Sequence, residues 1–220
     1  MQCTRPIAQL LGVNTTTEFR ADAESPKRHA MLEAGAALFM AQGYGAVSMD
    51  AVARAAGVSK ATLYAHFSSK EQLFATIIGD ACRQKIALGE ELLPAHATDV
   101  RAALTSFGGR LLRFFLEERP LALHRVVIGE SPRFPELGRA FYDNGPKALI
   151  GMFAAWLIEQ TDAGRLAVHD PAMAGEQFVA MLRTSLFLRA SLGLAQATEA
   201  EIDATVAAAV TTFLKANAPG

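Results

Sequence analysis

The chain contains 220 residues, of which 51% are hydrophobic and 20% are charged. This apolar content excludes an intrinsically disordered protein, and 17 glycines and 9 prolines without a regular period exclude a collagen-like one. The 21 lysines and arginines nearly balance 22 aspartates and glutamates. The resulting net charge of −1 provides no overall attraction for nucleic acid, so any such contact requires a local patch.

Cysteine usage and hydropathy bear on location. Cys3 and Cys82 are too few for a disulfide framework, which favours a reducing compartment. Cys82 is expected to be a small buried apolar residue rather than a redox sensor. The apolar run at 148–158 is far shorter than the roughly 20 residues of a membrane span, and the first residues lack the core of a signal peptide. We therefore expect a cytoplasmic protein with no membrane partner.

Helical signals begin after the first 24 residues. Residues 1–24 have mixed polarity and no sustained period, which predicts a flexible N-terminal tail. Ser25 and Pro26 are typical of a helix cap and first turn, and Gly43 of a left-handed helix end. Serines open the next elements in chain order: Ser48, then Ser59, then Ser68 in a capping box with Glu71, for a helix that extends to about Glu91 and closes before Pro94.

The remaining chain has a helical period throughout, with no β alternation and no internal repeat. The predicted helices cover about 98–118 (ending before Pro120), 121–130, 135–160 with a kink allowed at Gly145–Pro146, 171–188 after the cap Asp170, and a last helix opened by a capping box of Thr198 and Glu201. The predicted fold class is therefore all-α, with about nine helices.

The most informative segment covers residues 48–67 and reads SMDAVARAAGVSKATLYAHF. Two short helices joined by a glycine turn are typical of a helix-turn-helix, in which the first helix braces the second against the major groove of DNA. Ala53 permits a close approach of the helices, Gly57 can take a positive φ, and Leu63 and Phe67 are expected to bury the back of the second helix. Its front would then carry Lys60, Ala61, Thr62 and Tyr64.

This string, followed by Ser-Lys-Glu and Leu73-Phe74, resembles the DNA-binding domain of the tetracycline-repressor (TetR) family from about Lys27 to Ile78. The segment from Pro132 through Gly145–Pro146 resembles the family's AefR-like type of C-terminal domain. The resemblance implies a helix-turn-helix domain at 25–78 and a ligand-binding and dimerisation domain at 79–220. It further implies a homodimer that binds palindromic double-stranded operator DNA and a small-molecule effector, and that pairs through the last two helices of each subunit.

Roles carried over from the family fall on seven residues of the DNA-binding domain. Ser48 would cap the supporting helix and bind a phosphate, whereas Lys60, Ala61 and Thr62 would face the bases, Lys60 being the best candidate for a guanine edge. The remaining three, Tyr64, His66 and Lys70, would contact backbone phosphates. Three of these positions also have a plainer interpretation: packing for Tyr64 and His66, and a solvated charge for Lys60. Asp50 departs from the family pattern, since some relatives place a basic, base-contacting residue nearby.

The C-terminal domain offers candidates for an effector site. Ligand sites are mostly apolar with a few placed polar groups, which points to these residues: Phe107, Leu111, Phe114, Phe153, Trp156 and Phe178 as walls, and His124, Arg125 and Tyr142 as polar groups, with Arg183 as a further candidate. The alternative for the aromatic residues is an ordinary core, and for Arg125 a salt bridge to Glu118 or Glu130. An anionic ligand would suit an arginine on an apolar helix.

Enzymatic motifs are absent from the sequence: there is no G-x-S-x-G, no phosphate-binding glycine loop and no H-E-x-x-H. The five histidines lack the spacing of metal ligands, so no cofactor or metal is expected. We therefore predict a ligand-responsive transcriptional regulator, a repressor released by a lipophilic or aromatic effector. The alternatives are an activator and a helical ligand-binding protein or enzyme that has lost operator binding.

Overall fold

The computed structural model describes residues 26–80, 93 and 97–219. The predicted tail at 1–24, Ser25, the predicted helix end near Glu91, and Cys3 and Cys82 lie outside these residues. Every regular element that is described is a helix, which confirms the all-α prediction. Ten helices have both ends within the described ranges: α2 (Pro26–Gln42), α3 (Met49–Ala55), α4 (Lys60–His66), α6 (Val100–Leu116), α7 (Glu118–Glu130), α8 (Pro135–Asn144), α9 (Pro146–Asp162), α10 (Pro171–Leu182), α11 (Ser185–Ser191) and α12 (Glu199–Ala216). A further helix begins at Lys70 and is described as far as Asp80.

Two predicted long helices are each divided, which accounts for the larger number. The segment at 135–160 breaks at Gly145, because Pro146 has no N–H to donate and restricts the backbone of the residue before it. The segment at 171–188 breaks after Leu182, where Arg183 leaves the helical conformation with a ψ of 57°. Because no proline or glycine stands at this break, the signals that predict helix ends from sequence do not mark it.

Two other boundaries differ from the prediction. Pro120 lies in the first turn of α7 rather than between two helices, a position in which its missing N–H has no helical partner to lose. The capping residues before the helix at 70 are Ser69 and Gln72, one position later than predicted. The Ser69 hydroxyl accepts from the Gln72 N–H at 3.2 Å, and the Gln72 side chain accepts from the Ser68 N–H at 2.6 Å. The capping box of Thr198 and Glu201 is confirmed.

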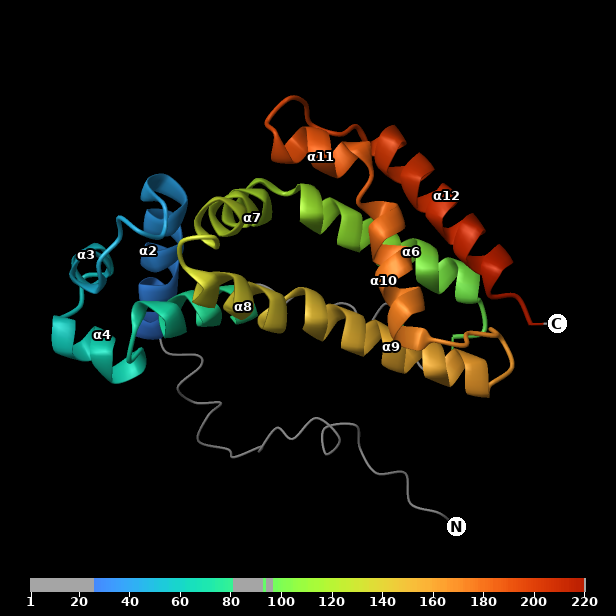
Figure 1. The fold of residues 1–220 in the computed structure, drawn as a ribbon, viewed down its shortest axis with the longest axis horizontal. Helices are drawn as coiled ribbons and strands as arrows, with labels where there is room; N and C mark the ends of the chain where they lie inside the picture. Colours follow the sequence, from blue (N-terminus) through green and yellow to red (C-terminus); the bar gives the residue numbers. More distant parts are fainter. Residues whose placement is uncertain (1–25, 81–92, 94–96, 220) are drawn as a thin grey trace, which may run out of the picture.

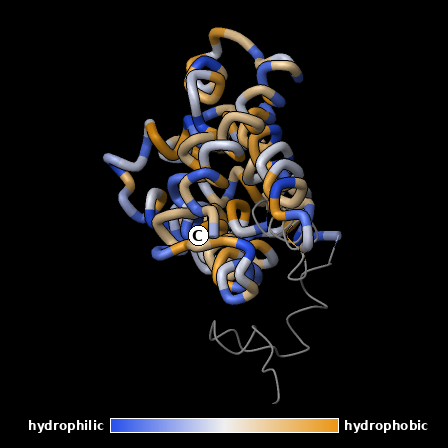
Figure 2. The backbone as a smooth tube through the Cα atoms, turned by 90° about the vertical axis from the view of Figure 1, so that its right-hand side faces the viewer, coloured by the Kyte–Doolittle hydropathy of each residue, from blue (hydrophilic) through white to orange (hydrophobic). Residues whose placement is uncertain are grey.

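The helices bury their apolar faces in two clusters. One joins α6, α9, α10 and α12 and contains most of the buried aromatic rings. The other belongs to the N-terminal helices and also takes in Leu123 and Val127 of α7 and Leu137 of α8. In Figure 1, α7 accordingly lies between the N-terminal helices and the rest of the bundle. Figure 2 shows the alternation of hydrophilic and hydrophobic residues along the helices that this packing requires.

Within the described residues, every helix is too short or too polar to cross a bilayer.

Candidate nucleic-acid interface and effector site

Short polar caps start both helices of the predicted helix-turn-helix. The Ser48 hydroxyl accepts from the Ala51 N–H at 3.2 Å and starts α3, and the Ser59 hydroxyl accepts from the Thr62 N–H at 3.0 Å and starts α4. A helix of seven residues has few internal hydrogen bonds, so such caps contribute a large share of its stability. The predicted capping role of Ser48 is confirmed.

The turn between the two helices is closed by a Schellman motif. Gly57 has a φ of 66°. Its N–H donates to the carbonyl oxygen of Arg54 at 3.2 Å, and the Val58 N–H donates to the carbonyl oxygen of Ala53 at 3.0 Å. The positive φ explains the need for glycine, because a side chain in this conformation would approach the backbone too closely. The turn sets the direction in which α4 leaves α3.

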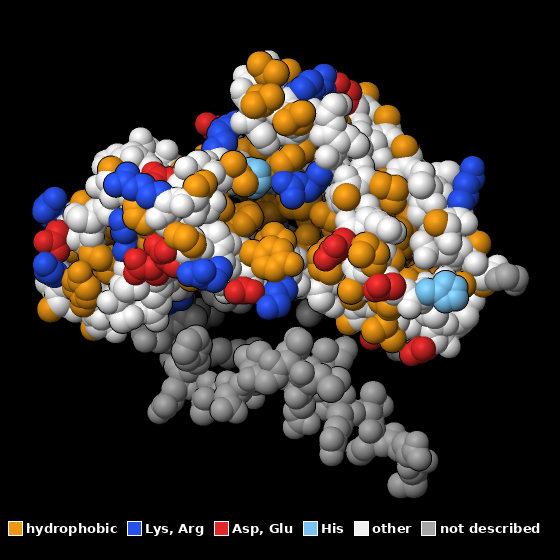
Figure 3. Space-filling model, in the orientation of Figure 1, with side chains coloured by type: hydrophobic (Ala, Val, Ile, Leu, Met, Phe, Trp, Pro, Cys, Tyr) orange, Lys and Arg blue, Asp and Glu red, His pale blue; other side chains and the backbone are white. Residues whose placement is uncertain are grey.

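The two sides of α4 differ as predicted. Leu63 and the following Phe67 are buried in the N-terminal core, whereas Lys60, Ala61 and Tyr64 are exposed. Thr62 and His66 are half-buried at the border, and the Thr62 hydroxyl lies 2.8 Å from that of Ser59. Figure 3 shows that the end of the molecule formed by α3 and α4 carries basic side chains on both sides of an acidic one.

An ion pair that the sequence analysis missed links α3 to α4. The Lys60 ammonium lies 2.9 Å from Oδ1 and 3.2 Å from Oδ2 of Asp50. Both side chains remain accessible, with 63% of Lys60 and 48% of Asp50 exposed. The Asp50 carboxylate raises the pKa of Lys60. The best candidate for a base contact is therefore held by the residue that departs from the family pattern.

Lys70 has backbone partners in this structure. Its ammonium donates to the carbonyl oxygens of Tyr44 at 2.8 Å and Val47 at 3.0 Å, and it lies 4.3 Å from the centroid of the Tyr44 ring. These bonds hold the segment between α2 and α3 against the helix that begins at Lys70. The phosphate contact expected of Lys70 remains a prediction.

α7 connects the N-terminal helices to the C-terminal domain. Arg119 forms a two-pronged ion pair with Glu33 of α2 at 2.8 and 2.9 Å, which lowers the pKa of Glu33. Leu123 and Val127, one and two turns further along, are buried in the N-terminal core. A displacement of α7 would therefore move α2 with it.

The aromatic wall candidates pack against one another. Phe153 is fully buried, and its ring centroid lies 4.9 Å from that of Phe107, 5.3 Å from Phe178 and 6.0 Å from Trp156. Leu111 is buried in the same cluster, and Phe114 packs at its edge. In this structure these residues thus form the core of the C-terminal domain, and a role in lining an effector site remains a prediction for them.

A second group of side chains gathers around His124 on α7. Its ring lies 5.2 Å from Phe187 of α11 and 6.1 Å from Phe141 of α8, and its Nε2 lies 3.3 Å from an Arg183 nitrogen. Burial, followed by the charges of Arg183 and Arg125, lowers the pKa of His124 and favours its neutral form. Figure 3 shows a hollow with apolar walls on this face, with a histidine and basic side chains at its edge.

Arg183 lies among aromatic rings. Its guanidinium is 4.1 Å from the centroid of Phe187 and 5.6 Å from that of Phe115, and burial lowers its pKa. Within the described ranges, no carboxylate forms an ion pair with it. An arginine that is stacked on rings and lacks an acidic partner is suited to bind a negatively charged oxygen.

The other two polar candidates lie elsewhere. Arg125 donates to the carbonyl oxygens of Ala190 and Ser191, both at 2.7 Å, so its guanidinium caps the end of α11. The alternative salt bridge to Glu118 or Glu130 is wrong, because the ion pairs among the described residues do not include Arg125. Tyr142 is exposed on α8, next to Phe141.

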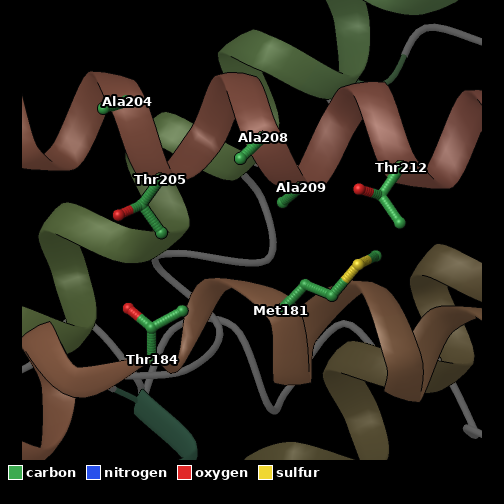
Figure 4. A pocket seen from close by; sticks show the side chains of 7 residues that line it. All are labelled: Met181, Thr184, Ala204, Thr205, Ala208, Ala209 and Thr212. Carbon is green, nitrogen blue, oxygen red and sulfur yellow. The ribbon is translucent and has the colours of Figure 1, made fainter.

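A groove of about 400 Å³ separates the end of α10 from α12. Figure 4 shows Met181 and Thr184 on one side of it, opposite Thr205, Ala209 and Thr212 of α12. Most of its lining side chains are small. The groove therefore lies on the segments that were expected to form the dimer.

Comparison with known proteins identifies the family. Residues 31–77 match the model of bacterial regulatory proteins of the tetR family, and residues 102–219 match that of the C-terminal domain of AefR-like transcriptional repressors. The chain belongs to the TetR family. It is accordingly a ligand-responsive, DNA-binding transcriptional regulator, and proteins of this kind bind operator DNA, dimerise and bind small molecules.

Solved structures of this TetR-family regulator's relatives cover most of its length. A TetR-family regulator from Mesorhizobium loti is 28% identical, covers 93% of this chain and is itself fully covered, with a TM-score of 0.78. The Flavonoid-responsive Regulator FrrA is 40% identical, with a TM-score of 0.74. The match covers 88% of this chain and 97% of the FrrA chain. The transcriptional activator FasR of Mycolicibacterium smegmatis is 44% identical over 52 residues, and this chain spans only 24% of its length.

Proposed function

We propose that this regulator is a cytoplasmic, homodimeric repressor that leaves a palindromic operator when an acidic aromatic molecule, such as a plant polyphenol, occupies the hollow beside His124 and Arg183. The observation that carries this proposal is Arg183, a cation stacked on Phe187 and Phe115 without an acidic partner in the described structure. A planar phenol would stack on these rings and present its oxygen to the guanidinium.

The neutral state of His124 supports the same ligand class. Its pKa is lowered by burial and by the charges of Arg183 and Arg125, which favours a neutral ring beside the positive charge of Arg183. A phenolate or carboxylate oxygen would offset the charge of Arg183 and could accept a hydrogen bond from either side chain. The 40% identical relative FrrA is named as responsive to flavonoids, which are planar phenols of this kind.

The route from the effector to DNA would run through α7. His124 of α7 packs against Phe187 of α11, Arg125 holds the end of α11, and Arg119 is paired with Glu33 of α2. A ligand that binds more tightly to one position of α7 than to another shifts the position of α2 and of the helix-turn-helix. In a dimer, this would change the spacing of the two DNA-binding helices.

The groove between α10 and α12 supports pairing with a second copy through these helices. Small side chains such as Ala204 and Ala208 allow close approach of two helices, and a two-fold pair of such faces forms a four-helix bundle. Three leucines nearby in the chain are left accessible, at 59% for Leu188, 63% for Leu192 and 71% for Leu194. A partner subunit would remove such apolar surface from water.

Sedimentation of a groove variant tests the dimer. Ala208→Glu places a charge in the groove and is expected to give monomers at micromolar concentration. Ala207→Glu is the matched control, because Ala207 is also exposed on α12 but does not line the groove. Dimers of equal strength for both variants would contradict pairing through this face.

Calorimetric titration with a trihydroxyflavone, which is planar, and its O-methylated form tests the effector site. We expect the free phenol to bind and the methylated form to bind at least tenfold more weakly. Arg183→Met is expected to weaken phenol binding by about 10- to 100-fold, as for the loss of a charge-assisted hydrogen bond. The control Arg101→Met removes an exposed arginine at the start of α6. Equal affinity of Arg183→Met and the unaltered chain would contradict this site.

DNA release tests the regulatory part. Fluorescence anisotropy with DNA from upstream of the protein's own gene should show binding that the phenol reverses, and binding that the phenol leaves unchanged would contradict the mechanism. The second candidate, an activator, is favoured by the 44% identity over 52 residues to the transcriptional activator FasR. A reporter gene behind the same DNA separates the two: deletion of the regulator raises expression for a repressor and lowers it for an activator.

A further inference from the structure

The ion pair between Lys60 and Asp50 occupies the exposed face at the junction of α3 and α4. Its two side chains come from the two helices of the helix-turn-helix and meet at 2.9 Å. Among the described residues, the carboxylate of Asp50 has Lys60 as its only partner, and the ammonium of Lys60 additionally lies 5.9 Å from the Tyr64 ring. With 63% and 48% exposure, donor and acceptor sites of both groups remain open to a third molecule.

Stability does not account for this pair. Ion pairs between exposed side chains contribute little to folding, because water already solvates both charges. A carboxylate on a surface that approaches DNA is also repelled by the phosphates, which weakens binding unless the carboxylate meets a hydrogen-bond donor. In the major groove such donors are the amino groups of cytosine and adenine, and they belong to base edges rather than to the backbone.

We propose that Lys60 and Asp50 act together as a reader of one C·G base pair in each half of the operator, with Asp50 accepting from the cytosine amino group and Lys60 donating to the guanine edge. The inference rests on the operator binding proposed above and assigns a specificity-determining role to Asp50.

The geometry of the pair matches that of the base pair. In a C·G pair the cytosine N4 donor and the guanine O6 acceptor are joined by a hydrogen bond and so lie about 3 Å apart in the major groove. The Asp50 oxygen and the Lys60 nitrogen have the same separation, with the opposite order of acceptor and donor. Placed edge to edge, the four groups form two new hydrogen bonds while both existing ones are kept.

The same order of groups favours C·G over the three other base pairs. With G·C, the reversed pair, Asp50 would face the O6 acceptor and Lys60 the amino donor, so both contacts become unfavourable. An A·T pair has the correct order, but thymine offers Lys60 one acceptor beside a methyl group, whereas guanine offers both O6 and N7. With T·A, as with G·C, the order is wrong.

Selection from a randomised double-stranded DNA library with the full-length protein tests this reader. We expect the unaltered chain to select a two-fold symmetric sequence with a C·G pair at one position of each half. Asp50→Asn removes the charge and adds a donor, so the preference at that position should relax towards adenine, with other positions unchanged. Discrimination of C·G against G·C should fall by about 10- to 100-fold. Lys60→Met should lose the preference at the same position.

A matched control separates base reading from a general effect of charge. Asp143→Asn removes an equally exposed aspartate that pairs with Lys147 at 3.0 Å on the C-terminal domain, and it should leave the selected sequence unchanged. If Asp50→Asn instead raises affinity equally for all sequences and keeps the selected sequence, Asp50 only restrains Lys60 and the reader is overturned. If the unaltered chain selects no common sequence, both operator binding and the reader are overturned.

Discussion

The N-terminal helices at 26–80 and the C-terminal domain at 97–219 are built in different ways. The three helices that follow Ser48, Ser59 and Ser69 are each capped by the side chain of that serine, and the turn at Gly57 needs a positive φ. In the C-terminal domain, α6, α10 and α12 are capped by a side chain, but α7, α8, α9 and α11 begin without one. Local signals thus mark the short helices of the DNA-binding part, whereas four helices of the C-terminal domain lack such a signal and are positioned by packing.

The largest effect should come from the aromatic core of the C-terminal domain. Phe153→Ala removes a fully buried ring that contacts Phe107, Trp156, Phe178 and Phe213, and it should lower the free energy of unfolding by about 3–5 kcal/mol. Urea denaturation measures this loss. The exposed Met173 provides a control, since Met173→Ala on α10 should leave the unfolding midpoint nearly unchanged. A loss below about 1 kcal/mol for Phe153→Ala would mean that the ring lies beside a cavity instead.

The next largest effect concerns Lys70. Lys70→Met removes two hydrogen bonds from a partly buried ammonium to the carbonyls of Tyr44 and Val47, and should lower the free energy of unfolding by about 1–3 kcal/mol. Lys60→Met is the comparison within the same domain, because Lys60 is exposed and should leave the unfolding midpoint unchanged. Urea denaturation monitored by circular dichroism checks both variants. Equal midpoints for the two would contradict the structural role of Lys70.

The same contrast decides which features the sequence could predict. The caps at Ser48 and Ser59, the positive φ of Gly57 and the burial of Leu63 all follow from signals within a few residues, and the structure confirms them. In the N-terminal helices, a local error moved a cap from Ser69 to Ser68, because Glu71 and Gln72 can both complete a capping box with a serine three residues earlier.

Contacts between distant residues could not be predicted in this way. Arg125 looked like a ligand group, yet its partners are carbonyl groups some 65 residues further along the chain. The division of α10 and α11 at Arg183 likewise has no local signal, and the position of Arg183 over Phe187 follows from it. The pairing of Asp50 with Lys60 could have been noticed, since the two residues flank a turn of known geometry and carry opposite charges.

Two glycines sharpen the comparison because they should respond in opposite directions. Gly57→Ala places a side chain at a φ of 66°, so it should lower the free energy of unfolding by about 1–2 kcal/mol, although no atom obstructs the new Cβ. Gly151 is an exposed glycine within α9, also with open space, and Gly151→Ala should raise the free energy of unfolding by roughly 0.5–1 kcal/mol. Thermal unfolding of both variants measures the two shifts. A stabilising Gly57→Ala would contradict the left-handed turn.

The smallest effect concerns the ion pair that joins the two regions. Glu33 of α2 and Arg119 of α7 are each nearly half exposed, at 46% and 47%, so solvent screens their attraction and the pair should contribute only about 0.2–1 kcal/mol. A double-mutant cycle of Glu33→Gln and Arg119→Gln measures this coupling at pH 7.

The pH dependence of that coupling has a definite sign. The hydrogen bond from Arg119 lowers the pKa of Glu33 below its ordinary value of 4.5 in the folded protein. The contribution is therefore fully present above pH 4.5 and is lost as the pH falls through the lower, folded-state pKa. A coupling that stays constant through this acid range would mean that Arg119 and Glu33 interact through packing of their side chains rather than through their charges. In that case α7 would still move α2 through Leu123 and Val127, and Arg119→Gln should leave effector-induced release from DNA intact.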